Sequence, residues 1–305
     1  MFTEVTLGEA LNAENQLEPA SLIVDKTSIL GRGRGRFGSV TPVYRGTYEG
    51  TPVVIKQLTV VEGLVSNSEA SEILKRIHIL STIRDTRLVS FFGACVTVPT
   101  EEFSLPSLCV VAELMPMGSL HELLHTTKLE ITLEERLTIA VQVSEGVAFL
   151  HGLTPILIHQ RLKSSNVLLD ETMNAKLCDF GLTHLTQHMM RLDLVAKRDH
   201  GSEDFIYIAP ELFEPEENLT DRSDVWALGC VVVETLTGRL PWDGQKDAVN
   251  VWRRIVQARQ LPFSEWTQVP SAVQTLAQQA FTFDPKDRIN AVHFLAGLKI
   301  CASHP

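Results

Sequence analysis

The sequence lacks any uninterrupted apolar segment long enough to span a bilayer. It also lacks the basic region followed by an apolar core that marks a secretory signal. No lysine or arginine precedes Lys26, whereas acidic residues recur there, which disfavours an arginine-rich organellar presequence. We therefore expect an intracellular, cytoplasmic protein with no membrane span.

Cysteine is scarce, and the spacing of the cysteines does not indicate disulfide bonds. The five cysteines form no C-x-x-C pair, and their number is odd. Neither a disulfide framework nor a cysteine-based zinc site is indicated. Several lie in apolar runs, where cysteine behaves as a small core residue, and this pattern is typical of a reducing compartment.

Positive charge is also in deficit. Lys and Arg number 27 against 37 Asp and Glu, which gives a net charge of −10. A chain this acidic is a poor general binder of nucleic acid, so we expect no nucleic-acid partner. With 44% apolar residues in 305, the chain can bury a large core or two modest ones.

Strand-like and helical patterns divide the chain unequally. Strand signals dominate from Ile29 to about Asp85, with a helical stretch from about Ser68 to Ile83. Later segments are mostly helical, including an amphipathic helix over Leu133–Leu150 and a more buried one over Val225–Leu236. Short strands are expected near Asn166-Val-Leu-Leu and Ala175-Lys-Leu-Cys. This pattern predicts an α+β fold with two lobes and a ligand cleft between them.

The expected boundaries follow from these patterns and from the hinge-like Met115-Pro116-Met117-Gly118. They are an acidic lead-in at 1–27, an N-terminal lobe at 28–112, a hinge at 113–117, a C-terminal lobe at 118–300 and a tail at 301–305.

A glycine-rich segment and a lysine suggest a phosphate site. Gly33, Gly35 and Gly38 precede Val40 in Gly-Arg-Gly-Arg-Phe-Gly-Ser-Val, and such glycines let backbone N–H groups approach phosphate oxygens. Alone, this pattern fits a plain glycine-rich hairpin about equally well. Lys56 ends the apolar strand Val-Val-Ile-Lys and could direct its ammonium at the same phosphates.

Two later motifs carry oxygen ligands. The first is His159-Gln-Arg-Leu-Lys-Ser-Ser-Asn-Val-Leu-Leu169, and the second is Asp179-Phe-Gly181. The side chains of Asn166 and Asp179 offer hard oxygens suited to Mg²⁺ bound to phosphates. Ile-Ala-Pro-Glu211, Ser-Asp-Val-Trp-Ala-Leu-Gly229 and Asp-Pro-Lys-Asp-Arg288 follow in order.

This ordered set resembles the eukaryotic protein kinases, over roughly residues 28–300, and most closely the tyrosine-kinase-like group. The resemblance implies a bilobal fold, with a small antiparallel sheet lobe and a large helical lobe, that binds ATP and Mg²⁺. It also implies roles for individual residues. The phosphate-covering loop would comprise Gly33, Gly35, Gly38 and Val40, and Lys56 would contact the α- and β-phosphates. The metal ligands would be Asn166 and Asp179, and the adenine contacts Glu113, Met115 and Leu168.

The same resemblance assigns structural roles. Ala112 falls at the gatekeeper position, where so small a side chain implies an open back pocket. Glu211 and Arg288 match the ion pair of the large lobe. His159 and Phe180 match an apolar spine, together with Leu80 and Phe91.

The pattern departs from the family at the catalytic base. The family has His-Arg-Asp, whereas this chain has His159-Gln-Arg161, with Lys163 and Asn166 at the family spacing. Arginine stays protonated and cannot accept the proton of a substrate hydroxyl. Asp170 is expected in the following turn, where it could not substitute.

Other positions also depart. Gln160 replaces an arginine that commonly pairs with a phosphorylated activation loop. The glutamate expected to pair with Lys56 is replaced by Arg76, so either Glu72 serves instead or the pair is absent. Thr41-Pro-Val43 looks like an insertion in the glycine-rich hairpin.

Three functions remain open from the sequence. The first is a pseudokinase that binds ATP and Mg²⁺ and acts by allostery or scaffolding on signalling partners. The second is a weakly active Ser/Thr protein kinase. The third is a scaffold without nucleotide.

Overall fold

The computed structural model describes residues 17–34, 40–59, 79–97, 107–127, 129–180, 203–213 and 219–303. Contacts divide them into two compact units, and the main division falls between Leu114 and Met115. The strand unit contains the described residues up to Asp85 and Val89–Leu114. The helical unit contains Thr86–Leu88 and the described residues from Met115 onward. The expected hinge at 113–117 includes this division.

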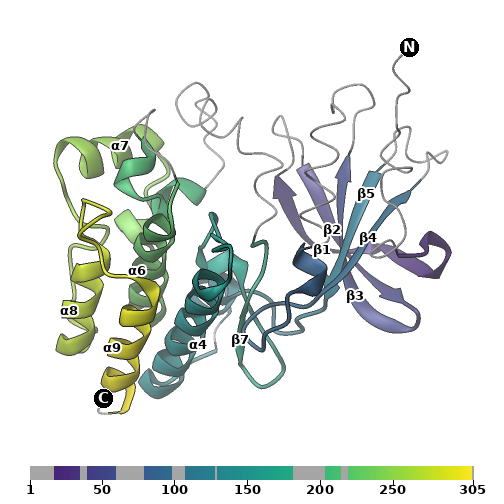
Figure 1. Cartoon of the computed structure of the whole chain (residues 1–305), viewed down its shortest axis with the longest axis horizontal. Coiled ribbons are helices and arrows are strands. Elements are labelled where there is room, and N and C mark those ends of the chain that lie inside the picture. The colour runs from purple at the N-terminus through teal and green to yellow at the C-terminus, as the bar shows by residue number, and fades with distance from the viewer. Residues whose placement is uncertain are drawn as a thin grey trace. The chain divides into compact units, whose positions relative to one another are not determined.

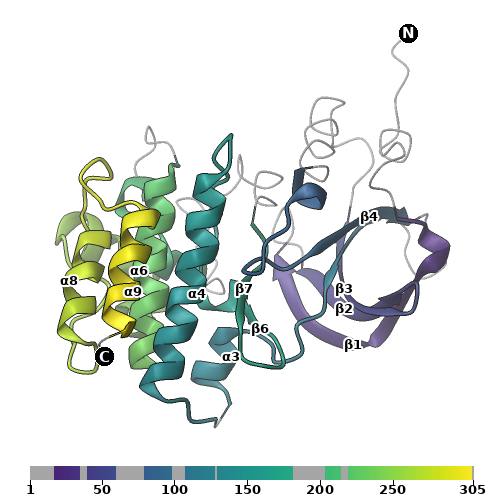
Figure 2. The same ribbon diagram turned by 60° about the horizontal axis from the view of Figure 1, so that its bottom comes forward.

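The strand unit is one antiparallel sheet in the order β1-β2-β3-β5-β4. Figure 2 shows that this sheet is strongly curved. A short 3-10 turn, η1, Pro19–Ser21, precedes it. The strands are β1, Leu22–Arg34, β2, Val40–Tyr48, β3, Thr51–Thr59, β4, Phe91–Thr97, and β5, Ser107–Glu113.

Alternation along β3 determines which side chains enter the core. Val53 and Ile55 are buried against Cys95, Cys109 and Val111. Because successive strand residues point to opposite faces, Lys56 lies on the face away from this cluster. The apolar run therefore stabilises the sheet while it keeps the lysine outside this core.

The sheet begins earlier than residue 28, the expected boundary of the lobe. β1 starts at Leu22 and pairs with β2 from Leu22↔Tyr48 onward. Leu17 is buried, and its backbone N–H donates to Ala94 O at 3.0 Å. The acidic residues around this segment obscured the short apolar run Leu22-Ile-Val24, which pairs as a strand.

The expected insertion at Thr41-Pro-Val43 is part of β2. These residues pair with β1 through Gly33↔Thr41, Arg32↔Pro42 and Gly31↔Val43. The extra length therefore extends the paired strands instead of forming a separate loop. Residues 35–39 lie outside the described residues.

The helical unit contains most of the remaining elements. Figure 1 shows α4, α6, α9 and α8 side by side, in agreement with their mutual contacts. Its helices are α3, Leu120–His125, α4, Leu133–Gly152, α6, Asp221–Thr237, α7, Ala248–Trp252, α8, Ser271–Ala280, and α9, Ala291–Ser303. A hairpin joins β6, Val167–Leu169, to β7, Ala175–Leu177. Shorter turns are η3, Ser164–Asn166, η5, Glu203–Tyr207, η6, Pro210–Phe213, η7, Pro241–Gly244, and η8, Arg253–Gln257, which is a π-helical turn.

Local signals explain where the main helices begin and how deeply they pack. Ser119 and Thr132 form capping boxes with Glu122 and Glu135, which satisfy free N–H groups at the starts of α3 and α4. Every residue from Ser223 to Leu236 in α6 is buried. The expected helices around 133–150 and 225–236 and the two short strands are confirmed.

Together these units confirm the expected α+β class, a five-stranded antiparallel sheet with a mainly helical remainder. The five cysteines form no disulfide. Among the helices described, none is long and apolar enough to cross a membrane. The expected helix from about Ser68 to Ile83 lies largely outside the described residues, and residues 79–82 are helical.

The strand unit yields a stability prediction at Gly46. A Cβ there would collide with the carbonyl oxygen of Ile23 and the δ-methyl of Ile55. We predict that Gly46→Ala lowers the free energy of unfolding by about 1–3 kcal/mol, as overpacking does. Urea denaturation measures the change. Gly31→Ala is the control, because no atom lies within 4 Å of a Cβ there; equal effects from both variants would contradict the prediction.

Candidate active site

The β6–β7 hairpin brings the two expected metal ligands to one end. Val167 pairs with Leu177, and the backbone N–H of Cys178 donates to Asn166 O at 3.0 Å. Asn166 immediately precedes β6, and Asp179 follows β7 by one intervening residue. Two residues that are distant in sequence thus become neighbours through backbone pairing.

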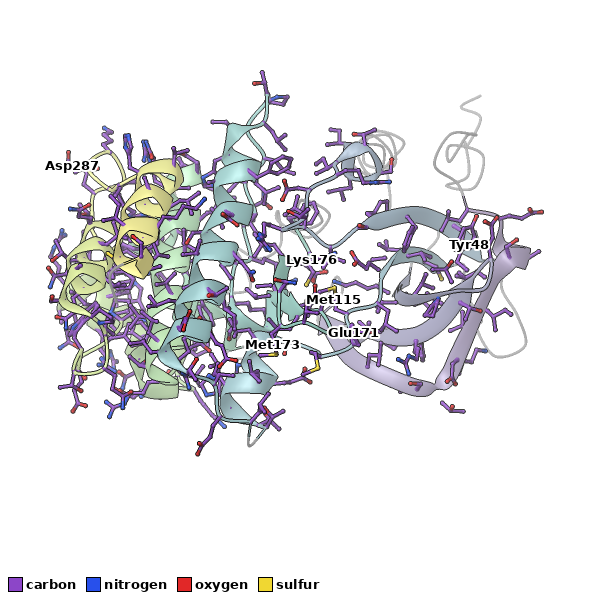
Figure 3. All side chains as sticks on the ribbon, turned by 90° about the horizontal axis from the view of Figure 1, so that it is seen from below. Tyr48, Met115, Glu171, Met173, Lys176 and Asp287 are labelled. Atoms are coloured by element: carbon purple, nitrogen blue, oxygen red, sulfur yellow. The ribbon has the colours of Figure 1, made fainter. Side chains whose placement is uncertain are left out.

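The opposite end of the hairpin is its turn. Figure 3 shows Glu171 and Met173 in this turn and Lys176 on β7. The hairpin therefore separates the turn residues from the Asn166 and Asp179 end by the length of its two strands.

The orientation of the Asn166 amide fits a cation ligand. Its Nδ2 donates to the backbone oxygen of Arg161 at 2.7 Å, and the residue is 7% exposed. With the nitrogen used in this way, Oδ1 is the atom that can coordinate a metal. Paired with the Asp179 carboxylate, it supplies hard oxygens of the kind that Mg²⁺ prefers.

Asp224 of α6 fixes the backbone of residues 159–166, the segment that the family resemblance assigns to the catalytic loop and that is called the catalytic loop below. Its two carboxylate oxygens accept from the backbone N–H groups of His159, at 2.7 Å, and Gln160, at 2.8 Å. His151 Nε2 lies 2.9 Å from Asp224 Oδ2. Gln160 has φ of 73°, a left-handed conformation that is costly for a non-glycine residue. The carboxylate of a buried helix therefore holds the unusual turn that presents Arg161.

His159 and Phe180 form the apolar support of the site. Their ring centroids lie 6.5 Å apart in an edge-to-face arrangement, and both residues are buried. Burial lowers the pKa of His159, against the opposing effect of the nearby Asp224 charge. His159 is thus a neutral packing residue.

Arg161 and Lys163 line a pocket of the helical unit. Its other walls come from the segment 207–212 and from α6. Asp224 borders the pocket too, but it is 2% exposed and accepts the hydrogen bonds from the loop. Both carboxylate oxygens of Asp224 are therefore committed to the loop backbone, which makes Asp224 a poor candidate for a catalytic base.

Asp170 cannot replace the base, because it stabilises the turn of the hairpin. Its Oδ1 accepts from the backbone N–H groups of Thr172 and Asn174, both at 2.9 Å. Desolvation would raise the pKa of Asp170, but these hydrogen bonds outweigh it and lower the pKa to about 2. The side chain thus remains an ionised cap of the turn, as its sequence position suggested.

A buried ion pair fixes the segment beyond the pocket. Arg288 Nη1 and Nη2 donate to the two carboxylate oxygens of Glu211 at 2.7 and 2.9 Å. Arg288 Nη1 also donates to the backbone oxygen of Arg222, and Ser223 Oγ donates to Glu211 Oε1. This bidentate pair ties η6 to the start of α6 and to the turn before α9.

In the strand unit, the expected nucleotide residues lie on paired strands. Lys56 of β3 is opposite Val43 and Val110, and Ala112 of β5 is opposite Val54. The backbone N–H of Glu113 donates to Ser90 O at 2.9 Å. Of the Glu113 backbone groups, the N–H is therefore already used, and the carbonyl is the candidate contact for adenine.

The remaining expected adenine contacts lie in the helical unit. Met115 is buried, and its carbonyl accepts from the backbone N–H of Gly118 at 3.3 Å. Leu168 is half-buried on β6 and pairs with Lys176 and Ser119.

Several expected residues lie at or beyond the limits of the described chain. Gly33 lies in β1 and Val40 in β2, whereas Gly35 and Gly38 are outside the described residues. The same holds for Glu72 and Arg76, so the partner of Lys56 on the expected helix stays a prediction.

Two polar residues of the helical unit have roles that the sequence motifs do not reveal. Asp224 belongs to the motif Ser-Asp-Val-Trp-Ala-Leu-Gly229, whereas Glu234 belongs to none of the motifs above. Glu234 is fully buried among polar partners. A carboxylate inside an otherwise apolar helix was the available signal, since buried charges need partners.

Comparisons with known proteins define the family of this chain. The sequence matches the protein kinase domain over residues 26–297, so the chain belongs to the protein kinase domain family. It is 37% identical over 70% of its length to a probable serine/threonine-protein kinase of Dictyostelium discoideum. It is 34% identical to the dual specificity protein kinase shkC of the same organism, over 70% of the chain, and to the serine/threonine-protein kinase CTR1 of Arabidopsis thaliana, over 69%. The matches span 21%, 39% and 24% of these relatives' own lengths.

The Glu211–Arg288 pair yields the second prediction. Arg288→Ala leaves Glu211 buried without its cation, so we predict a loss of about 3–5 kcal/mol in unfolding free energy. Urea denaturation followed by circular dichroism measures it. The matched control is Arg239→Ala, because Arg239 pairs with Glu265 at the surface, where such a pair contributes about 0–1 kcal/mol. A loss below about 1 kcal/mol for Arg288→Ala would show that the buried pair is dispensable.

Proposed function

We propose that this chain is the kinase domain of a serine/threonine protein kinase that binds ATP with Mg²⁺ and transfers phosphate slowly. The observation that carries the proposal is the position of Asn166 and Asp179 at the same end of the β6–β7 hairpin, with Arg161 where the family has its base. The kinase names of the relatives support an active domain, while Arg161 supports a low rate.

Residues of this chain would hold the nucleotide and metal. Asn166 Oδ1 and the Asp179 carboxylate would coordinate Mg²⁺, which bridges phosphates and neutralises developing charge when bound. On the family pattern, Lys56 would contact the phosphates, and the glycine-rich segment that includes Gly33, Gly35, Gly38 and Val40 would cover them. The adenine would contact the Glu113 carbonyl, Met115 and Leu168, next to the small Ala112.

The guanidinium of Arg161 explains the low rate. A positioned base contributes roughly 10²–10⁴-fold to a rate, and arginine cannot accept the proton. Its positive charge also lies where the hydroxyl of a substrate must approach. Phosphoryl transfer depends mainly on positioning and charge stabilisation, so the other residues can sustain residual transfer.

A second candidate is a pseudokinase that binds nucleotide and signals by allostery through protein partners. Arg161 is the specific observation that favours it. In this case nucleotide binding would stabilise one conformation by mass action, without turnover. A nucleotide-free scaffold is the third candidate, and it predicts no response to ATP.

Phosphotransfer from radiolabelled ATP to a generic protein substrate tests the proposal. We predict a weak signal for the wild type, a rise of roughly 10²–10⁴-fold for Arg161→Asp, and loss of signal for Asp179→Ala. Arg239→Asp is the matched control, since it makes the same charge change at an exposed residue outside the site.

Each alternative has a distinct outcome. A wild type that is stabilised thermally by ATP and Mg²⁺ but transfers no phosphate is a pseudokinase. A wild type without any thermal response to nucleotide is a scaffold. An unchanged rate in Arg161→Asp would show that the arginine does not limit transfer.

A further inference from the structure

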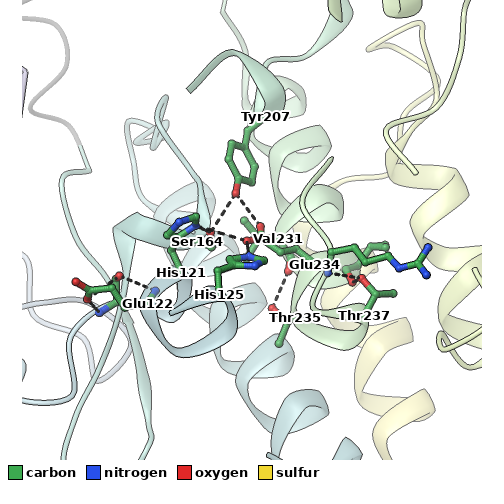
Figure 4. A network of polar contacts seen from close by, with 12 residues as sticks. His121, Glu122, His125, Ser164, Tyr207, Val231, Glu234, Thr235 and Thr237 are labelled. Atoms are coloured by element: carbon green, nitrogen blue, oxygen red, sulfur yellow. Dashed lines mark hydrogen bonds and ion pairs between the residues drawn. The ribbon is translucent and has the colours of Figure 1, made fainter. Parts of the chain in front are cut away.

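A second polar cluster lies within the helical unit and is formed by side chains of α3 and α6. Two histidines one turn apart on α3, His121 and His125, face Glu234 of α6 (Figure 4). The His125 Nε2 to Glu234 Oε1 distance is 2.9 Å, and the His121 Nδ1 to Glu234 Oε1 distance is 4.0 Å. These three ligand atoms lie within 4.8 Å of one another.

This spacing suits a small metal ion. Metal–ligand bonds of about 2.0–2.2 Å around a tetrahedral ion place its ligands about 3–3.5 Å apart. The separations of 2.9 Å (His125 to Glu234) and 4.0 Å (His121 to Glu234) lie just below and just above this range. Histidines at positions i and i+4 present their rings on one helix face, and two histidines with a glutamate are an established ligand set for zinc.

Neighbouring groups hold the cluster in place. Tyr207 Oη donates to Glu234 Oε2 at 2.8 Å, which leaves Oε1 directed at the histidines. Ser164 Oγ lies 3.0 Å from Tyr207 Oη and 3.3 Å from His121 Nδ1 (Figure 4). Hydrogen bonds of this kind orient the carboxylate and hold the hydroxyl of Ser164 next to His121.

The burial pattern gives both a reason for a cation and a path to the site. The side chain of Glu234 is 0% exposed, so its negative charge requires compensation. The side chains of His121 and His125 are 27% and 18% exposed, so an ion can reach them from solvent. A metal would take the place of the direct contact between His125 Nε2 and Glu234 Oε1, which lie 2.9 Å apart.

We propose that His121, His125 and Glu234 form a zinc site, with Ser164 Oγ or water as the fourth ligand. The nitrogen ligands favour zinc over magnesium. Within the described part of the chain, no other three such side chains come this close together. The site would join α3 and α6 to the turn Ser164–Asn166 through Ser164, and to η5 through Tyr207. It is independent of whether the domain transfers phosphate.

The test is zinc titration of the chelator-stripped chain, with competition against a chromophoric chelator. We predict one tightly bound equivalent, and a rise in melting temperature of about 5 °C when free zinc exceeds the dissociation constant by ~100-fold. Cobalt should substitute, with visible absorption typical of tetrahedral nitrogen and oxygen ligation.

Variants assign the site. Loss of a group that supports a metal ligand weakens metal binding roughly 10–100-fold, and we expect this loss for Tyr207→Phe. His121→Ala and His125→Ala each remove a ligand, so each should weaken zinc binding by more than that. His293→Ala is the matched control, because this histidine is exposed on α9. Asp179→Ala should keep zinc binding, which separates this site from the magnesium site.

Folding is checked independently by circular dichroism in the presence of chelator, and His121→Gln provides a milder second variant. Loss of the bound equivalent in folded His121 and His125 variants, with retention in His293→Ala, supports the site. Absence of binding in the wild type, or undiminished binding in both histidine variants, overturns it.

Discussion

The hydrogen bonds between the Asp224 carboxylate and the backbone of His159 and Gln160 are the interaction on which the candidate active site depends. They cross from a helix buried along its length to a loop whose backbone includes a left-handed residue. A left-handed non-glycine conformation costs free energy unless its surroundings hold it. The deeply packed α6 provides that support, and the conformation of the loop is therefore a consequence of the core.

Glu234 and Asp224 show how α6 combines burial with polarity. Both acids are buried in one helix, and each carboxylate accepts hydrogen bonds from a different segment of the functional region. Asp224 holds the start of the catalytic loop, and Glu234 holds Tyr207, which contacts Ser164 near the end of that loop. Isolated buried charges would destabilise the helix, so these partners are part of its stability.

Much of the fold could be predicted from the sequence, because apolar periodicity and ordered motifs are local signals. The helices around 133–150 and 225–236 and the hairpin strands follow from such signals. The start of β1 at Leu22 could not be predicted from the sequence, since the apolar run there is short and acidic residues surround it. The His121, His125 and Glu234 cluster was missed for another reason: Glu234 lies 109 residues beyond His125, and only the fold brings it to the two histidines.

The contacts of the catalytic loop also explain how the fold accommodates arginine at position 161. Asp224 binds the backbone N–H groups before this residue, and Asn166 donates to its backbone carbonyl. None of these hydrogen bonds uses the side chain at position 161. These hydrogen bonds can therefore form whichever side chain stands at position 161. Asn166 and Asp179 thus lie at one end of the hairpin, close in sequence to a residue whose side chain cannot accept a proton.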